Sequence, residues 1–125
     1  MSQPISTLMQ REVASVSPDA TMQTVEALMV ARGLSWVPVL EGGGAVLGVI
    51  SSTDLLRFHA DGKDPASVCA WQICTYKPIV VRPDTPLGEV ARLMVESNVH
   101  HVVVAEGADF KGVVSSFDFV RTFMA

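Results

Sequence analysis

The chain has 125 residues, 49% of them hydrophobic and 18% charged, which suits one compact domain or two half-domains sharing a core and excludes a catalytic domain with a separate regulator. Its net charge is −4 and its nine Lys and Arg are scattered, so a nucleic acid is not an expected partner, because polyphosphate binding needs clustered basic residues. No apolar run approaches the ~18–20 residues of a membrane span and the first residues, MSQPISTLMQRE, lack signal-peptide features, so we expect a cytoplasmic protein without a membrane partner.

The first predicted element is a helix between Thr21 and Gly33. Threonine is a favourable N-cap residue, and the apolar residues that follow it recur at the spacing of one helical face. These residues are Met22, Val25, Leu28 and Met29. Glycine readily adopts the left-handed conformation that closes a helix, so the helix is predicted to end at Gly33.

Two strands and a short helix are predicted next. The strands, over 36–40 and 45–51, are rich in β-formers and are joined by a Gly-rich turn over 41–44. Their residues are nearly all apolar rather than alternating with polar ones, so we expect both faces of the sheet to be covered. A short helix is predicted to begin near Ser52.

A polar segment then leads into a second series of the same elements. A small helix is predicted over 66–73 and a strand over 79–81. The next helix is predicted to have Thr85 as its N-cap and Pro86 as its first residue, and to end at Asn98, since Asn also tolerates the left-handed conformation. Two strands and a short helix are predicted to complete the chain.

The two series are copies of one unit. Residues 16–39 reappear as 81–104 at an offset of 65, and residues 48–57 reappear as 112–121 at an offset of 64. The missing residue falls in the Gly-rich turn, where a hairpin tolerates a change of length. We therefore predict an α/β (α+β) fold of two β-α-β-β-α repeats. The predicted division is a first domain over 1–60, a linker over 61–66 and a second domain over 67–125.

Each copy carries the motif Gly-h-h-Ser-x-x-Asp, where h is apolar, between its second strand and its last helix. Its polar residues are Ser51 and Asp54 in one copy and Ser115 and Asp118 in the other. The free N–H groups and the positive dipole at a helix start suit a phosphate, and a carboxylate can accept from two neighbouring ribose hydroxyls. The alternative is a local role, in which Ser caps the helix and Asp balances its dipole.

With this motif, the segments from Val16 to Arg57 and from Val81 to Arg121 resemble two consecutive CBS domains (cystathionine beta-synthase domains). The resemblance implies a CBS-pair module with pseudo-twofold symmetry that usually forms a homodimer. It implies no catalytic cofactor, but a ligand among AMP, ADP, ATP, NAD and S-adenosylmethionine. Carried over by position, it implies ribose contacts from Asp54 and Asp118, phosphate contacts from Ser51 and Ser115, and base contacts from Val37, Pro38, Val102 and Val103.

Two further observations qualify these contacts. Arg57 and Arg121 end the last helices of the two copies and could reach a phosphate, although cations at a helix end also simply offset its dipole. The family often has Pro where Pro38 stands, whereas the second copy has Val103, so base packing is expected to differ between the copies.

Other polar residues give weaker signals. Adjacent His100 and His101 point to opposite faces of a strand, which disfavours a shared metal ion, although either ring could contact a base. Cys69 and Cys74 lack a second pair for zinc. No nucleophile, base and orienting group can be assembled, so an enzyme is not expected. The sequence predicts a regulatory, signal-transducing module that binds an adenosine nucleotide and acts on an unidentified effector protein. The alternative is a ligand-free CBS pair that serves as a dimerisation or scaffold module for a partner protein.

Overall fold

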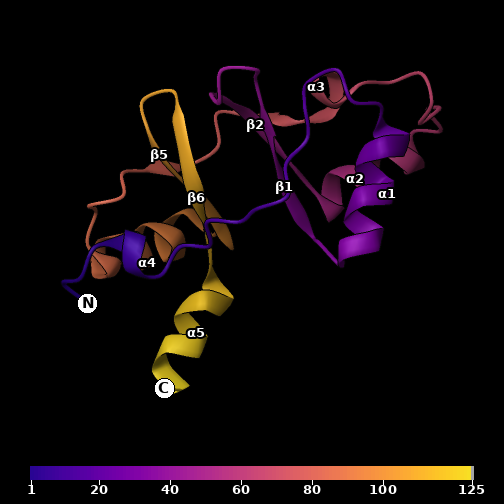
Figure 1. Cartoon of the computed structure of the whole chain (residues 1–125). Coiled ribbons are helices and arrows are strands. Elements are labelled where there is room, and N and C mark those ends of the chain that lie inside the picture. Colours follow the sequence, from indigo (N-terminus) through magenta and orange to yellow (C-terminus); the bar gives the residue numbers. More distant parts are fainter. Residues whose placement is uncertain (125) are drawn as a thin grey trace. The chain divides into compact units, whose positions relative to one another are not determined.

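The computed structural model describes residues 1–124, and these residues group into two compact units (Figure 1). The first-repeat unit is Ala14–Pro78, and the second-repeat unit is Met1–Val13 together with the chain from Ile79 onward. The ranges 1–60 and 67–125 describe the sequence copies and stay a prediction. The compact units cut across these ranges, because each repeat is completed by a segment that precedes the other one.

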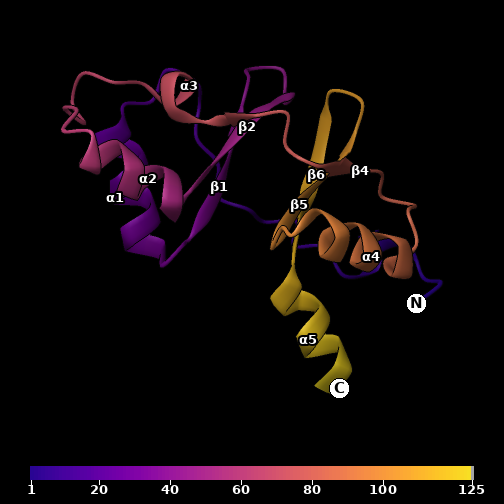
Figure 2. The same ribbon diagram turned by 180° about the vertical axis from the view of Figure 1, so that it is seen from behind.

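The first-repeat unit has a small antiparallel sheet with helices packed on it. Its strands are ordered β1-β2-β3, and Val16 extends the sheet by a parallel bridge to Val39 of β1. Figure 2 shows α1 and α2 together on one side of the β1–β2 hairpin. The elements in chain order are α1 (Met22–Arg32), β1 (Trp36–Leu40), β2 (Val46–Ser51), α2 (Ser52–Ala60), α3 (Ala70–Ile73) and β3 (Thr75–Tyr76).

The second-repeat unit is built in the same way. Its strands are ordered β4-β5-β6, with β4 parallel to β5, and Gln10 bridges to Val113 of β6. Counting the isolated bridges, both sheets therefore have the same order of segments. The elements are the 3₁₀ helix η1 (Ile5–Thr7), β4 (Val80–Val81), α4 (Leu87–Ser97), β5 (His101–Glu106), β6 (Asp109–Ser115) and α5 (Ser116–Met124).

Each sheet is completed by a segment that precedes the other repeat in sequence. Thr75 pairs with Val49 of β2, and Gln10 exchanges two backbone hydrogen bonds of 2.8 and 3.0 Å with Val113 of β6. The motif glycines permit this approach, because a Cβ atom on Gly48 would lie 2.5 Å from the Thr75 carbonyl oxygen. The glycine of the repeated motif is thus required by the sheet edge.

The helix ends test the predicted caps. The Thr21 hydroxyl accepts from the Thr24 N–H at 3.2 Å, as predicted. Gly33 and Asn98 end α1 and α4 in the left-handed conformation, with φ values of 63° and 53°, which confirms both predicted stops.

The predicted start of the second long helix is wrong. Pro86 is the N-cap of α4 and has extended backbone, so Thr85 lies outside the helix. The helix needs no side-chain cap there, because the Gln3 and Met1 carbonyl oxygens accept from the N–H groups of Leu87 and Gly88 at 2.8 and 2.9 Å. The first residues of the chain therefore satisfy the start of α4.

The small helix predicted over 66–73 is shorter than expected. Only Ala70–Ile73 is helical within it. Residues 65–67 form a turn instead, in which the Ser67 N–H donates to the Asp64 carbonyl oxygen at 3.2 Å. The carbonyl groups of Pro65 and Val68 accept from the N–H groups of Gln23 and Met22 at 3.0 and 2.8 Å. The segment before α3 therefore supplies hydrogen-bond acceptors to the start of α1.

Each unit has its own hydrophobic core. In the first-repeat unit, Val37 and Val39 of β1 pack with the apolar face of α1 and with Phe58 of α2. In the second-repeat unit, Val102 and Val104 of β5 hold the matching places. Consecutive residues of β1 and β5 are buried, so side chains on both faces of these strands are covered, as predicted.

The helices of the described residues are too short to cross a membrane. The longest, α1 and α4, have eleven residues each, about half of the ~20 that a span requires.

Candidate functional site

In the first-repeat unit, the motif Ser and Asp form a reciprocal capping box at the start of α2. The Ser51 N–H donates to Asp54 Oδ2 at 2.8 Å, and the Ser51 hydroxyl donates to the same oxygen at 3.0 Å. The Asp54 N–H in turn donates to Ser51 Oγ at 3.3 Å. The local role considered from sequence is therefore real, and it occupies one carboxylate oxygen of Asp54.

The second oxygen of Asp54 is only loosely held. Arg57 Nη1 and Thr75 Oγ1 both lie 3.5 Å from Oδ1, at the limit of a hydrogen bond. Thr75 reaches this oxygen from β3, the strand that completes the sheet edge. The carboxylate is 10% exposed, so Oδ1 is a desolvated acceptor with spare capacity, since a carboxylate oxygen can accept more than one bond.

The second-repeat unit repeats the two backbone N–H bonds of the box at the same distances and has closer contacts at the other carboxylate oxygen. The Ser115 N–H donates to Asp118 Oδ2 at 2.8 Å, and the Asp118 N–H donates to Ser115 Oγ at 3.3 Å. Asp118 Oδ1 accepts from Arg121 Nη1 at 2.6 Å and from Gln10 Nε2 at 3.2 Å. The Asp118 carboxylate is 4% exposed. Both oxygens of this carboxylate are thus engaged inside the unit.

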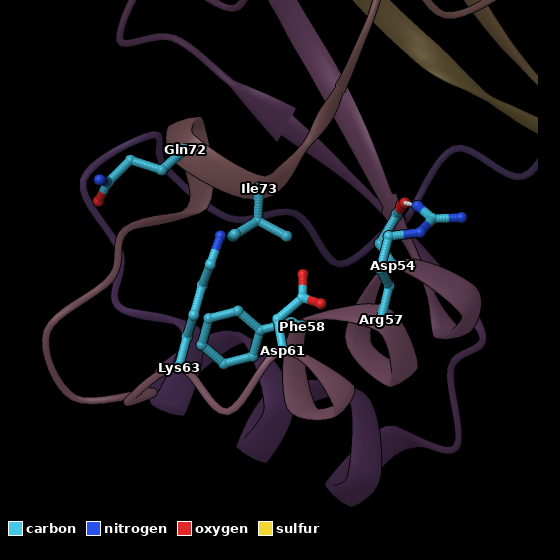
Figure 3. Close-up of a pocket in the computed structure, with 7 residues that line it drawn as sticks. All are labelled: Asp54, Arg57, Phe58, Asp61, Lys63, Gln72 and Ile73. Carbon is cyan, nitrogen blue, oxygen red and sulfur yellow. Dashed lines mark hydrogen bonds and ion pairs between the residues drawn. The ribbon is translucent and has the colours of Figure 1, made fainter.

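A pocket lies beside Asp54, between α2 and α3 (Figure 3). Its volume is about 120 Å³. In Figure 3 the Lys63 and Asp61 side chains both reach towards Ile73, while the Arg57 guanidinium lies against Asp54. The complete lining is Asp54, Arg57, Phe58, Asp61, Lys63, Gln72 and Ile73.

This pocket combines two residues predicted from sequence with one that was missed. Asp54 and Arg57 line it together, whereas Ser51 is not part of the lining. Lys63 adds a second cation, and no sequence signal identified it because it lies in the predicted linker. At 120 Å³ the pocket is smaller than the ~300 Å³ of small-molecule sites. It can hold a sugar- or phosphate-sized group, not a whole nucleotide.

The predicted base contacts do not share one surface. Val37 and Val102 lie in the hydrophobic cores of their units and have no exposed area. Pro38 and Val103 are also buried, but as next residues along their strands they point to the opposite sheet faces. The base assignment therefore stays a prediction, and only one member of each pair can face a given ligand.

A ring-bearing residue lies across the sheet from each motif serine. Trp36 pairs with Ser51 in the first-repeat unit, and His101 pairs with Ser115 in the second. Burial lowers the pKa of His101 below its usual 6.5, the neighbouring His100 lowers it further, and the Asp118 carboxylate partly opposes both effects. The His101 imidazole is therefore neutral at pH 7.

The cysteines and histidines do not form a metal centre in the part of the chain that the structure describes. Within residues 1–124 no three His, Cys, Asp or Glu side chains gather where they could hold an ion. Cys69 and Cys74 are free thiols at the two ends of α3. Burial raises the pKa of the Cys74 thiol, which disfavours the reactive thiolate.

Comparison with known proteins places these features in a family. The model of the CBS domain matches residues 5–61 and 70–125. Arabinose 5-phosphate isomerase KpsF of Escherichia coli is 29% identical over 115 residues, which are 91% of this chain and 35% of that protein. The chain thus spans about a third of this relative.

Two solved structures have the same fold. The structure of CBSX2 in complex with AMP matches with a TM-score of 0.88 and 22% identity, over 98% of this chain and 96% of that one. The CBS domain pair of protein MJ0100, in complex with 5′-methylthioadenosine and S-adenosyl-L-methionine, matches with a TM-score of 0.83 and 21% identity, over 96% and 98%. With two consecutive matches of the family model and the duplicated fold, the chain belongs to the CBS domain family and is a CBS pair.

Proposed function

We propose that this CBS pair is a regulatory module that binds an adenosine-containing nucleotide and passes its level on to an effector protein. The observation that carries the proposal is the loosely held Oδ1 of Asp54, a residue that lines a pocket together with the cationic side chains of Arg57 and Lys63 and the carboxylate of Asp61. Support comes from CBSX2, which is bound to AMP, and from the MJ0100 pair, which is bound to S-adenosyl-L-methionine and 5′-methylthioadenosine.

The chemistry of the pocket suits the polar part of a nucleotide. Two ribose hydroxyls can donate to Asp54 Oδ1, because its present contacts at 3.5 Å cost little to replace. Arg57 and Lys63 can then neutralise a phosphate. Ser51 can contribute to phosphate binding only if its hydroxyl leaves Asp54 Oδ2, to which it now donates.

The assignment in the second-repeat unit rests on the equivalent positions of the repeated motif. Asp118 would accept from ribose, and Ser115 and Arg121 would contact phosphate. Arg121 would have to leave Asp118 Oδ1 to do so, because it now donates to that oxygen at 2.6 Å. The base would contact the strand residues predicted from sequence or the rings of Trp36 and His101, which pair with the motif serines.

The module is proposed to act without catalysis of its own. The chain covers 35% of KpsF, so the isomerase activity of that protein is not carried over. A regulator needs only differential affinity of the ligand for two states of the module.

A second candidate function, a ligand-free dimerisation module, is favoured by a separate observation. Val30 of α1 and Val95 of α4 occupy equivalent positions in the two repeats and are 82% and 80% exposed. A homodimer through these helices would bury both. Light scattering on the wild type and on the Val30→Asp, Val95→Asp double variant tests this, since a dimer should become a monomer.

The experiment that tests the proposed function is a melting-temperature panel with AMP, ADP, ATP, NAD and S-adenosylmethionine, with ribose 5-phosphate as the ligand that lacks adenine. A ligand at 100 times its dissociation constant adds about 2.7 kcal/mol to the unfolding free energy. We expect at least one adenosine ligand to raise the melting temperature more than ribose 5-phosphate does. If none of the five does so at millimolar concentration and calorimetry shows no heat, the dimerisation function replaces the sensing function.

A further inference from the structure

The two motif aspartates are equivalent in sequence but have different neighbours on the completing segment. In the first-repeat unit that neighbour is Thr75, whose hydroxyl lies 3.5 Å from Asp54 Oδ1. In the second-repeat unit it is Gln10, whose amide donates to Asp118 Oδ1 at 3.2 Å. Thr75 and Gln10 hold the same place in the two sheets, opposite Val49 and Val113. The longer Gln10 side chain therefore reaches an oxygen that Thr75 barely contacts.

The arginine that follows each motif aspartate is also closer to the carboxylate in the second-repeat unit. Arg121 Nη1 lies 2.6 Å from Asp118 Oδ1, whereas Arg57 Nη1 lies 3.5 Å from Asp54 Oδ1. Arg121 also packs over the Phe117 ring, with its guanidinium carbon 4.7 Å from the ring centroid. The equivalent residue in the first repeat is Thr53, which offers no ring. The cation–π contact fixes Arg121 against the carboxylate.

A ribose meets two different acceptors as a result. At Asp54 its hydroxyls replace two marginal contacts. At Asp118 they must displace a neutral amide and compete with a short charge-assisted bond, and the amide of Gln10 occupies the oxygen as a ribose hydroxyl would.

We infer that the two sites bind unequally, with nucleotide filling the Asp54 site first while Gln10 holds the Asp118 site closed. This inference rests on the proposed nucleotide binding and adds to it an order of filling and a residue that sets it. Gln10 acts as a positioning residue, because it controls access to Asp118 from a side chain outside the motif. Replacing one hydrogen bond changes affinity by roughly two- to tenfold.

The test uses AMP as the probe and follows each site separately by amide NMR of the full chain. The side-chain amide of Gln10 is a direct reporter, since it shifts when it leaves Asp118. In the wild type, amides near Asp54 should saturate at a concentration at least tenfold lower than those near Asp118. The reciprocal variants Gln10→Thr and Thr75→Gln exchange the side chains that lie next to the two motif aspartates. We expect both variants to keep the backbone pairing of the two segments.

We expect Gln10→Thr to strengthen binding at Asp118 roughly two- to tenfold and to leave the Asp54 site unchanged, and Thr75→Gln to weaken binding at Asp54. Melting temperatures of both variants should stay within a few degrees of the wild type, which separates gating from loss of structure. The inference is overturned, while the proposed function stands, if AMP binds but fills the Asp118 site first. The same holds if Gln10→Thr leaves the AMP affinity of the Asp118 site unchanged. If AMP shifts no amide near either motif, both are overturned.

Discussion

The substitution Asp54→Asn separates the two roles of this side chain. Asp54 Oδ2 caps α2 by accepting from the Ser51 N–H at 2.8 Å, whereas Oδ1 is the proposed ribose acceptor. An asparagine keeps one carbonyl oxygen, which can continue to accept from Ser51, and replaces the other oxygen with a donor amide. Asp54→Ala removes both oxygens, so the two variants differ mainly in the cap.

The magnitudes follow from these contacts. Asp54→Ala leaves the Ser51 N–H unpaired where the carboxylate was 10% exposed, which costs about 1–3 kcal/mol of unfolding free energy and lowers the melting temperature by roughly 4–12 °C. Asp54→Asn loses mainly the dipole interaction, under about 1 kcal/mol. Each variant loses a charged ribose acceptor, worth about 1.5–3 kcal/mol, and AMP affinity should fall roughly ten- to a hundredfold.

The assay is calorimetric AMP affinity together with ligand-free melting of the wild type and both variants. Asp19→Asn is the matched control, because it removes the same charge from an exposed residue of the same unit outside the pocket. We expect the AMP affinity to fall in both variants and the unfolding free energy to fall mainly in Asp54→Ala. An Asp54→Asn variant that binds AMP like the control would show that the carboxylate only caps the helix.

Three further predictions concern other parts of the chain. Lys63→Met should weaken AMP binding roughly three- to tenfold and leave adenosine binding unchanged, since the lost cation serves the phosphate; equal losses for both ligands would contradict a phosphate role. Gly48→Ala should lower the unfolding free energy by about 1–3 kcal/mol, because its Cβ would lie 2.5 Å from the Thr75 carbonyl oxygen. Gly43→Ala is the control, because nothing lies within 4 Å of its Cβ, and urea unfolding of both variants should separate them. The lowered pKa of His101 means that the unfolded chain binds more protons than the folded chain just below pH 6.5, so stability falls as pH falls through this range. His101→Gln should flatten that slope in melts between pH 7.5 and 5.5, and an unchanged slope would refute the assignment.

Much of the local structure follows from local chemistry, which the sequence carries directly. Thr21, Gly33 and Asn98 identify helix ends because their preferred conformations and caps depend on a few adjacent residues. The motif spacing of Ser51 and Asp54 likewise predicts a capping box. The two sequence copies predict a repeated sheet because similar sequence patterns favour the same fold.

The parts that sequence reasoning missed depend on distant backbone pairing. The edge residues Gln10 and Thr75 are different residue types and lie outside the repeated sequence segments. Their equivalence is therefore visible only in their backbone pairing with Val113 and Val49. The error at Thr85 has the same origin, since the start of α4 is satisfied by carbonyl groups of the first residues of the chain.

The predicted base contacts conflict with the alternation of side chains along a strand. Val37 and Pro38 are consecutive in β1, and a period of two places them on opposite faces. The family resemblance indicated which strand contacts the base. The alternation of side chains along that strand decides which of its residues can contact a ligand on one face of the sheet.

In the proposed function, an adenosine nucleotide is held through its ribose hydroxyls by a motif carboxylate. The most direct measurement is calorimetric titration with AMP and with 2′,3′-dideoxy-AMP, which differ only in those hydroxyls. We expect AMP to bind at least tenfold more tightly than the dideoxy nucleotide in the wild type, a difference of about 1.4 kcal/mol, and this advantage to disappear in Asp54→Asn. Equal affinity of the two nucleotides for the wild type would contradict this expectation.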